Sequence, residues 1–375
     1  MPGDSKNYYY GIDLVRFCSA FLVAIFHIGF ACWASPTSGG QAMLRNAYAI
    51  PELAAFSWFG WVGVEIFFVI SGFVISSSAE NATPFSFFRS RILRLYPGVW
   101  ICATITALVL LINDLIHGVG RYLFSMALVP TGPFIDGQYW TLGVEIVFYT
   151  IIFLFVVSKA MDHVRLLAVV MALLSFMALA IMTVSGRFTF LEAGIWRLTL
   201  LNYGVYFALG MFIRQYFRNG LDGLSLFGVL LSLIGCILET RLHATGMSER
   251  VTNSPIILAQ VWPVATAVLA IGIAAIFLSV KYNSVFMRLP PRFLPIIRGL
   301  GLATYPLYLI HFSVGIWITR ELVGIGFPPI LALGTTLGAL SMFSWVIALY
   351  GEPPIRRTLR AAIAWRMHDR AEAAG

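Results

Sequence analysis

The segment GIDLVRFCSAFLVAIFHIGFACW, residues 11–33, decides the class of this protein. It is apolar over a length that suits a membrane-spanning helix, yet it contains Arg16 and His27. Eleven residues make about three helical turns, so the two side chains share one face and lie about 16 Å apart along the axis. Ionisable groups at membrane depth are costly unless they face a protein interior or a wet cavity. The pair therefore marks a candidate functional site within a membrane domain.

The composition extends this conclusion to the whole chain. Of its 375 residues, 59% are hydrophobic and 11% are charged, whereas soluble domains carry about 25% charged residues. Each apolar stretch is expected to be helical, because an isolated strand would leave its backbone groups unpaired in lipid. We therefore predict an all-α, polytopic membrane protein with about ten transmembrane helices. The predicted spans are 11–31, 58–79, 97–112, 140–158, 164–184, 195–216, 224–239, 256–280, 298–319 and 330–350.

The basic residues give this chain an orientation. With ten spans and an inner N-terminus, 18 of the 25 Lys and Arg residues fall on the inner side. By the positive-inside rule this predicts that both termini are cytoplasmic and that the protein is integral to the cytoplasmic, or inner, membrane. The net charge of +8 then reflects topology, and nucleic-acid binding is excluded because no soluble basic surface is predicted.

The cysteines carry no signal for a cofactor. The four cysteines are scattered, with no C-x-x-C pair, so the sequence predicts neither a disulfide nor a metal site. The oligomeric state does not follow from the sequence.

The ionisable residues within the predicted spans and at their inner boundary sort into two layers. The outer layer combines histidines with carboxylates, which can fix a histidine tautomer and support a general base; it contains His27, Glu65, Glu145 and His311. The inner layer is cationic and suits phosphates, which arginine binds bidentately; it contains Arg16, Arg89, Arg91 and Arg94, followed by Tyr96. Together the two layers suggest that a group is transferred from a phosphate-bearing donor at the inner side to an acid–base site at the outer side.

Structural roles are open alternatives for each of these residues. The arginines at 89, 91 and 94 could be positive-inside anchors whose side chains reach the lipid head groups. His27 could be a satisfied structural histidine, and Glu65 and Glu145 could be members of ion pairs, since a carboxylate in lipid needs a partner.

Five blocks of sequence resemble a known family. They are GIDLVRFCSAFLVAIFH (11–27), GWVGVEIFFVISGFVIS (60–76), FFRSRILRLYP (87–97), YWTLGVEIVFY (139–149) and, more weakly, ATYPLYLIH (303–311). In this order they resemble the acyltransferase-3 family of membrane acyltransferases, which O-acylates bacterial surface polysaccharides, lipopolysaccharide, nodulation factors and some antibiotics. The resemblance covers a domain at about 8–353, leaving 354–375 as a basic cytoplasmic tail. The chain departs from the family where paired acids are usual, since Ile146 follows Glu145.

The resemblance implies an activity and roles for the residues. It implies acyl-CoA, most simply acetyl-CoA, as a cytosolic donor and a sugar or glycan hydroxyl at the outer side as acceptor, with no metal. His27 would act as general base or transient acyl carrier, and Glu65 and Glu145 would orient His27 or the acceptor. The donor would be held by Arg16, Arg89, Arg91, Arg94 and Tyr96, and the acceptor by Tyr139, Trp140 and His311. The competing function is a secondary transporter or glycan-lipid flippase that uses the buried charges as a relay.

Overall fold

The computed structural model of the protein describes residues 8–116, 118–186, 191 and 194–372. Across these residues it contains helices and no strand, which confirms the predicted all-α class. Its α-helices are α1 (Tyr10–Phe26), α2 (Cys32–Ala34), α3 (Gly40–Leu44), α4 (Ala54–Ser57), α5 (Val62–Ala79), α6 (Pro84–Ile112), α7 (Val119–Met126), α8 (Trp140–Val157), α9 (Val164–Ser185), α11 (Gly204–Asn219), α12 (Gly223–Arg250), α13 (Leu258–Lys281), α14 (Asn283–Met287), α15 (Leu294–Ile310), α16 (Ser313–Gly324), α17 (Pro329–Val346) and α18 (Glu352–Glu372).

The number of spans differs from the prediction. Within the described residues, eight helices are long and apolar enough to cross a membrane, and a ninth span is possible if α15 and α16 count as one. The stretch predicted at 195–216 contains a 3-10 turn (Gly194–Thr199) followed by α11 of 16 residues. A helix of this length rises about 24 Å, which is short of the ~30 Å hydrocarbon core. The count of ten is therefore not confirmed, while the multi-pass membrane character stands.

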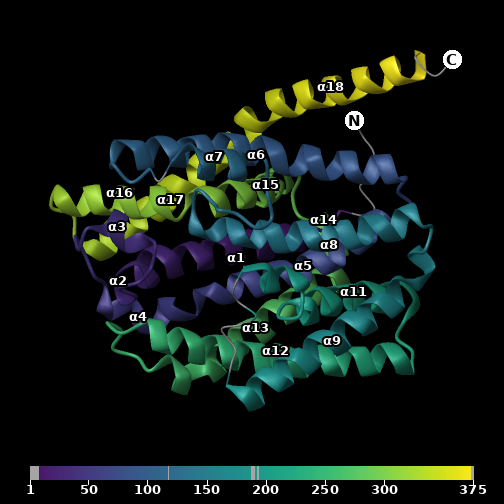
Figure 1. Ribbon diagram of the computed structural model, residues 1–375, viewed down its shortest axis with the longest axis horizontal. Helices are drawn as coiled ribbons and strands as arrows, with labels where there is room; N and C mark the ends of the chain where they lie inside the picture. The colour runs from purple at the N-terminus through teal and green to yellow at the C-terminus, as the bar shows by residue number, and fades with distance from the viewer. Residues whose placement is uncertain (1–7, 117, 187–190, 192–193, 373–375) are drawn as a thin grey trace.

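The helices form two groups on either side of α1. Figure 1 shows α6, α16 and α17 along one side of α1, and α9, α12 and α13 along the other. α1 packs directly against α5, α13 and α15. The short helices α2, α3 and α4 gather at one end of the bundle with α16, and α14 packs near the start of α1 at the opposite end. Because α1 is central, its polar side chains lie close to several neighbouring helices.

Two helices are longer than the apolar pattern predicted. α6 begins at Pro84, where the Thr83 side chain accepts a hydrogen bond from the Ser86 N–H and Pro84 occupies the first turn. Both features favour a helix start, and α6 then continues through Pro97 to Ile112. The three arginines of the third sequence block therefore lie on a helix. α12 likewise runs on to Arg250, eleven residues beyond the predicted end at 239, because its polar last turns remain packed against the bundle.

Glycines allow α5 and α11 to pack with their backbones in contact. A Cβ on Gly72 would lie 2.0 Å from the Phe207 carbonyl oxygen, and one on Gly210 would lie 2.0 Å from the Val69 carbonyl oxygen. Small residues at such crossings are how helices associate closely in membranes, where apolar burial alone gives little preference for protein over lipid. This close packing fixes α5, the helix that carries Glu65 and Ser71.

Two irregularities interrupt the helices near the first and last histidines of the predicted site. The first helix changes to a π-helical turn at His27–Ala31, a distortion that is common at functional sites. α15 and α16 meet at a bend of 78° between Ile310 and Ser313, next to His311. Each histidine thus lies where a regular helix ends, His27 at the end of α1 and His311 at the end of α15.

Candidate active site

His27 and His311 form a hydrogen-bonded pair at these two irregularities. His311 is fully buried, and its Nε2 lies 3.0 Å from His27 Nδ1. His311 Nδ1 lies 2.7 Å from the Tyr308 carbonyl oxygen, and His27 Nδ1 lies 3.1 Å from the Val23 carbonyl oxygen. A carbonyl oxygen only accepts, so we assign the proton to Nδ1 in both rings. The single His27 Nδ1–H is then shared between the Val23 carbonyl and His311 Nε2, and His27 Nε2 is left unprotonated, as a general base requires.

A buried loop holds the break beside His311. The Asp136 carboxylate accepts hydrogen bonds from the backbone N–H of Ser313 at 3.1 Å and from its hydroxyl at 2.8 Å, and so caps the start of α16. The Gln138 amide donates to Asp136 at 3.2 Å and to the Leu309 carbonyl at 2.8 Å, at the end of α15. Burial raises the pKa of Asp136 to about 6, although these hydrogen bonds act in the opposite direction. Backbone groups freed by the break are thereby satisfied, as their burial requires.

An inner cavity brings three of the predicted arginines together. Its volume is about 350 Å³, and its walls include Arg16, Arg91 and Arg94. Arg91 lies over the Tyr149 ring at 5.6 Å, and Arg94 lies over the Tyr305 ring at 5.4 Å. Aromatic faces of this kind stabilise guanidinium groups while leaving their N–H donors for a ligand.

Glu145 lies in this cationic cavity rather than in the outer layer predicted for it. It lines the same space as Arg16, and the Ser71 hydroxyl donates to its carboxylate. The prediction placed Glu145 by counting residues from an outer surface near Trp140. The loop that precedes α8 is itself buried, with Gln138 only 2% exposed, so the start of α8 packs inside the bundle. The structure shows Glu145 in contact with the arginine cavity, and its predicted role in orienting His27 or the acceptor stays a prediction.

A second arginine-lined space lies against the start of α6. Arg89 and Arg94 line an open groove of about 450 Å³ together with Arg356 and Arg360 of α18. Arg356 also donates to the Leu93 carbonyl at 3.1 Å and to Glu352 at 2.6 Å. Arg94 belongs to both spaces, so the groove and the inner cavity are neighbours.

Tyr96 lines a mostly apolar pocket that adjoins the inner cavity. Arg91 and Tyr149 line both spaces, whereas Tyr96 does not line the inner cavity itself. The Tyr96 hydroxyl donates to the Ala127 carbonyl at 3.3 Å. Its predicted contact with the donor stays a prediction.

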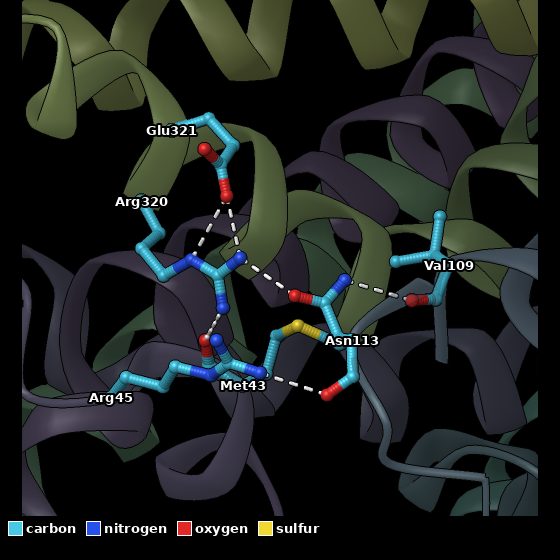
Figure 2. Close-up of polar contacts among 6 residues, drawn as sticks. All are labelled: Met43, Arg45, Val109, Asn113, Arg320 and Glu321. Carbon is cyan, nitrogen blue, oxygen red and sulfur yellow. Dashed lines mark hydrogen bonds and ion pairs between the residues drawn. The ribbon is translucent and has the colours of Figure 1, made fainter. Parts of the chain in front are cut away.

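An outer cavity lies on the other side of the histidine pair. It has a volume of about 310 Å³, and its lining includes Tyr122, Phe134 and Phe312 together with Arg121 and Asp136. Figure 2 shows the polar network that ties the helices at this end. Arg320 of α16 donates to the Met43 carbonyl at 2.9 Å and to the Asn113 side chain at 2.6 Å.

The same asparagine anchors a third segment of the network. Arg45 donates to the Asn113 carbonyl at 2.8 Å, and the Asn113 amide donates to the Val109 carbonyl at 2.8 Å. α3, α6 and α16 are thus fixed around the cavity, whose walls include Met43.

The histidine pair separates the inner and outer cavities. Tyr308 lines the inner cavity, and its ring centroid is 5.5 Å from that of His311. Phe312 lines the outer cavity, and its ring meets the His27 ring edge-on at 5.0 Å. Neither His27 nor His311 lines either cavity, so the Tyr308 ring lies between the pair and the inner cavity, and the Phe312 ring lies between the pair and the outer cavity.

Glu65 joins a cluster on α12. Its carboxylate converges with Glu239 and His243, whose ligand atoms all lie within 4.8 Å of one another. Gly63 faces α1, because a Cβ there would lie 2.3 Å from the Ser19 carbonyl oxygen. Glu65 is two positions on, about 200° around the helix, so its side chain points away from α1. The structure thus gives no support to the prediction that Glu65 orients His27.

The two aromatic residues predicted for acceptor binding are packing residues at the start of α8. Tyr139 is 1% exposed and belongs to the core. Trp140 packs against the Tyr203 ring at 5.3 Å, with Arg197 over its face at 4.8 Å. Neither residue lines the outer cavity. His311, the third residue of that predicted set, pairs with His27 instead.

The sequence prediction missed several residues that shape the site. Asp136 and Gln138 precede α8, and Glu352 begins α18; all three side chains are buried, at 4%, 2% and 1% exposure. Glu239 and His243 carried a detectable signal, since a Glu and a His four residues apart share a helix face. The signal was overlooked because the apolar stretch appeared to end at 239.

Comparison with known proteins identifies related sequences. A family profile described as an acyltransferase domain matches residues 9–351. The exopolysaccharide production protein ExoZ of Rhizobium meliloti (strain 1021) is 28% identical over 325 residues, which cover 80% of this chain and 91% of the relative. No solved structure is significantly similar to the chain.

Proposed function

Because this chain belongs to the acyltransferase-3 family of membrane acyltransferases, we propose that it moves an acyl group across the membrane. The proposed donor is acyl-CoA, acetyl-CoA in the first instance, bound from the cytosol. The proposed acceptor is a hydroxyl of a sugar or glycan at the outer side of the inner membrane. The observation that carries this proposal is the histidine pair between two cavities, one cationic and one aromatic.

The cationic side supports a phosphate-bearing donor. Arg16, Arg91 and Arg94 provide donors for phosphate oxygens or for the polar groups of the pantetheine arm. The neighbouring groove adds Arg89, Arg356 and Arg360, which we assign to the nucleotide phosphates. A cavity of about 350 Å³ is within the range of small-molecule sites, and it extends from Arg91 to Tyr308, beside His311.

The proposed chemistry uses His27 as the general base. His27 Nε2 takes the proton of the acceptor hydroxyl, and the resulting oxygen attacks the thioester carbonyl carbon. A C–O bond forms, the C–S bond breaks, and the imidazolium returns its proton to the departing thiolate to give the CoA thiol. His311 Nε2 accepts from His27 Nδ1–H, which stabilises the imidazolium during the step, in the way a hydrogen-bonded orienting group acts in other base-assisted acyl transfers.

The aromatic side supports a sugar acceptor. Tyr122, Phe134 and Phe312 offer ring faces, while Arg121 and Asp136 offer polar groups. Such a lining, apolar with few polar groups, is typical of sites that orient a small ligand. The similarity to an exopolysaccharide production protein supports a polysaccharide or its lipid-linked precursor as the acceptor.

One observation favours the alternative of a transporter or flippase. The 78° break between α15 and α16 resembles the discontinuous helices of secondary transporters. In this protein the backbone groups at the break are bonded by Asp136 and Gln138, whereas transporters use such groups to hold the substrate. We therefore rank transport second.

The proposal is tested with purified protein in nanodiscs. Acetyl-CoA binding and thiol release are measured for wild type, His27→Ala and Arg91→Ala, with His163→Ala as an exposed histidine control. We expect thiol release to require His27 and donor affinity to require Arg91. If folded wild-type protein binds no acyl-CoA, the donor assignment is wrong and the transport alternative becomes the one to pursue.

A further inference from the structure

The cluster of Glu65, Glu239 and His243 is not used by the proposed chemistry. Glu65 lies one turn into α5, and Glu239 and His243 lie four residues apart on α12. Glu65 is 2% exposed and Glu239 is 0% exposed. Two carboxylates this close in a buried site cannot both be charged unless a cation accompanies them. The cluster therefore needs either a shared proton or a bound metal ion.

The positions of the ligand atoms favour a metal ion. His243 Nδ1 lies 3.7 Å from Glu239 Oε1, which is too long for a hydrogen bond. Tetrahedral ligands at about 2.1 Å from a zinc ion are about 3.4 Å from one another, close to this separation. Within the described residues, Glu239 Oε1 receives no hydrogen bond although it is fully buried. The separation of Glu239 Oε1 and His243 Nδ1 is longer than a proton shared between these two atoms would give, and it suits two ligands of one ion.

The surroundings provide the supporting contacts that metal ligands need. The Tyr206 hydroxyl donates to Glu239 Oε2 at 2.6 Å, which leaves Oε1 directed at the cluster. The Trp61 ring stacks on His243, with centroids 4.1 Å apart and planes 24° apart, and so fixes the plane of the imidazole. Groups of this kind, which orient the ligands without touching the metal, are characteristic of protein metal sites. The His243 side chain is 15% exposed, so an ion has a route to the site.

We propose that Glu65, Glu239 and His243 bind one divalent transition-metal ion, with Zn²⁺ the best match to the donor set. One imidazole and two carboxylates form a three-ligand set that zinc accepts, with a fourth position for water. Two carboxylates, a neutral histidine and a divalent ion sum to zero charge, which suits a site at membrane depth. The ion would tie the start of α5 to α12.

The experiment measures metal in the intact protein. Tag-free wild type is purified in detergent without chelator, and zinc, manganese and iron are quantified by mass spectrometry. We expect about one ion per chain, its loss in Glu239→Gln and His243→Gln, and its retention in Glu80→Gln, an acid paired with Arg214 outside the cluster. Retention of metal in Glu239→Gln and His243→Gln would show that the ion binds elsewhere and would overturn the proposal.

A second measurement on wild type keeps the test decisive if the variants fold poorly. Chelator-treated wild type is titrated with Zn²⁺ while thermal unfolding is followed, and Co²⁺ is added in a parallel sample. We expect the unfolding midpoint to rise with Zn²⁺ and Co²⁺ to give the visible absorption of a tetrahedral site. Folded wild type that holds no metal, and whose unfolding midpoint does not respond to Zn²⁺, would overturn the proposal in favour of a shared proton.

Discussion

Replacing His311 by alanine removes the ring whose Nε2 lies 3.0 Å from His27 Nδ1. If His27 becomes an imidazolium during the reaction, this contact is a hydrogen bond to a charged group, worth about 1.5–3 kcal/mol. Since each ~1.4 kcal/mol is a factor of ten in rate, His311→Ala should lower kcat about 10- to 150-fold. The KM for the acyl donor should change little, because His311 lines no wall of the arginine cavity.

A conservative variant separates this role from simple packing. In His311→Gln the side-chain carbonyl can accept from His27 Nδ1–H, so much of the rate should return. The assay is thiol release from acetyl-CoA with acceptor present, in nanodiscs, with His163→Ala as the control and thermal unfolding as the check on folding. Equal rates for His311→Ala and wild type would refute the pairing argument. Equal damage in the alanine and glutamine variants, with both folded, would assign His311 a packing role.

Three further predictions concern the donor site, the helix break and the packing of α5. Arg91→Ala should raise the KM for acyl-CoA about 10- to 100-fold, as expected for a lost charged hydrogen bond, whereas Arg165→Ala should not; steady-state kinetics at saturating acceptor decide this. Burial raises the pKa of Asp136 from 3.8 to about 6. The stability that protonated Asp136 gives the folded state is therefore complete below pH ~3.8 and is lost as the pH rises through ~6. Between pH 4 and pH 7, wild type should therefore lose up to about 3 kcal/mol of unfolding free energy relative to Asp136→Asn. A difference in unfolding midpoints that does not change with pH would contradict this. Gly210→Ala should destabilise the protein by about 1–3 kcal/mol or more, because its Cβ would lie 2.0 Å from a backbone oxygen of α5. Gly334→Ala, in open space on α17, should instead stabilise the protein by up to about 1 kcal/mol. Thermal unfolding of both variants in one detergent tests this difference.

The membrane fold was predictable because it depends on composition and on the length of apolar runs. These identify the helices that cross the bilayer, and they identified most of those seen. Features that depend on packing were not predictable. The apolar pattern cannot distinguish α11, a 16-residue helix buried within the bundle, from a full span. Nor can it show that α6 begins at Pro84, since the arginines in its first turns lower the local hydropathy.

The candidate site was predictable only in part, because contacts between helices also depend on packing. The periodicity of one helix predicts which of its own side chains share a face, as for Arg16 and His27, but depth counted along separate helices cannot show which side chains meet. That is why Glu145 was assigned to His27 rather than to Arg16, and why the pairing of His27 with His311 became visible only in three dimensions. The buried loop at Asp136 holds the break at Ser313, and a loop's burial leaves little trace in sequence.

The measurement that tests the central claim most directly is acyl transfer across a sealed membrane. Protein is reconstituted in one orientation in liposomes, with labelled acetyl-CoA on the side of the arginine groove and a glycan acceptor on the side of the outer cavity. Wild type should release thiol on the donor side and place label on the acceptor across the bilayer, and His27→Ala should do neither while remaining folded. Transfer that persists in His27→Ala, or that occurs only when donor and acceptor share one side, would contradict the account.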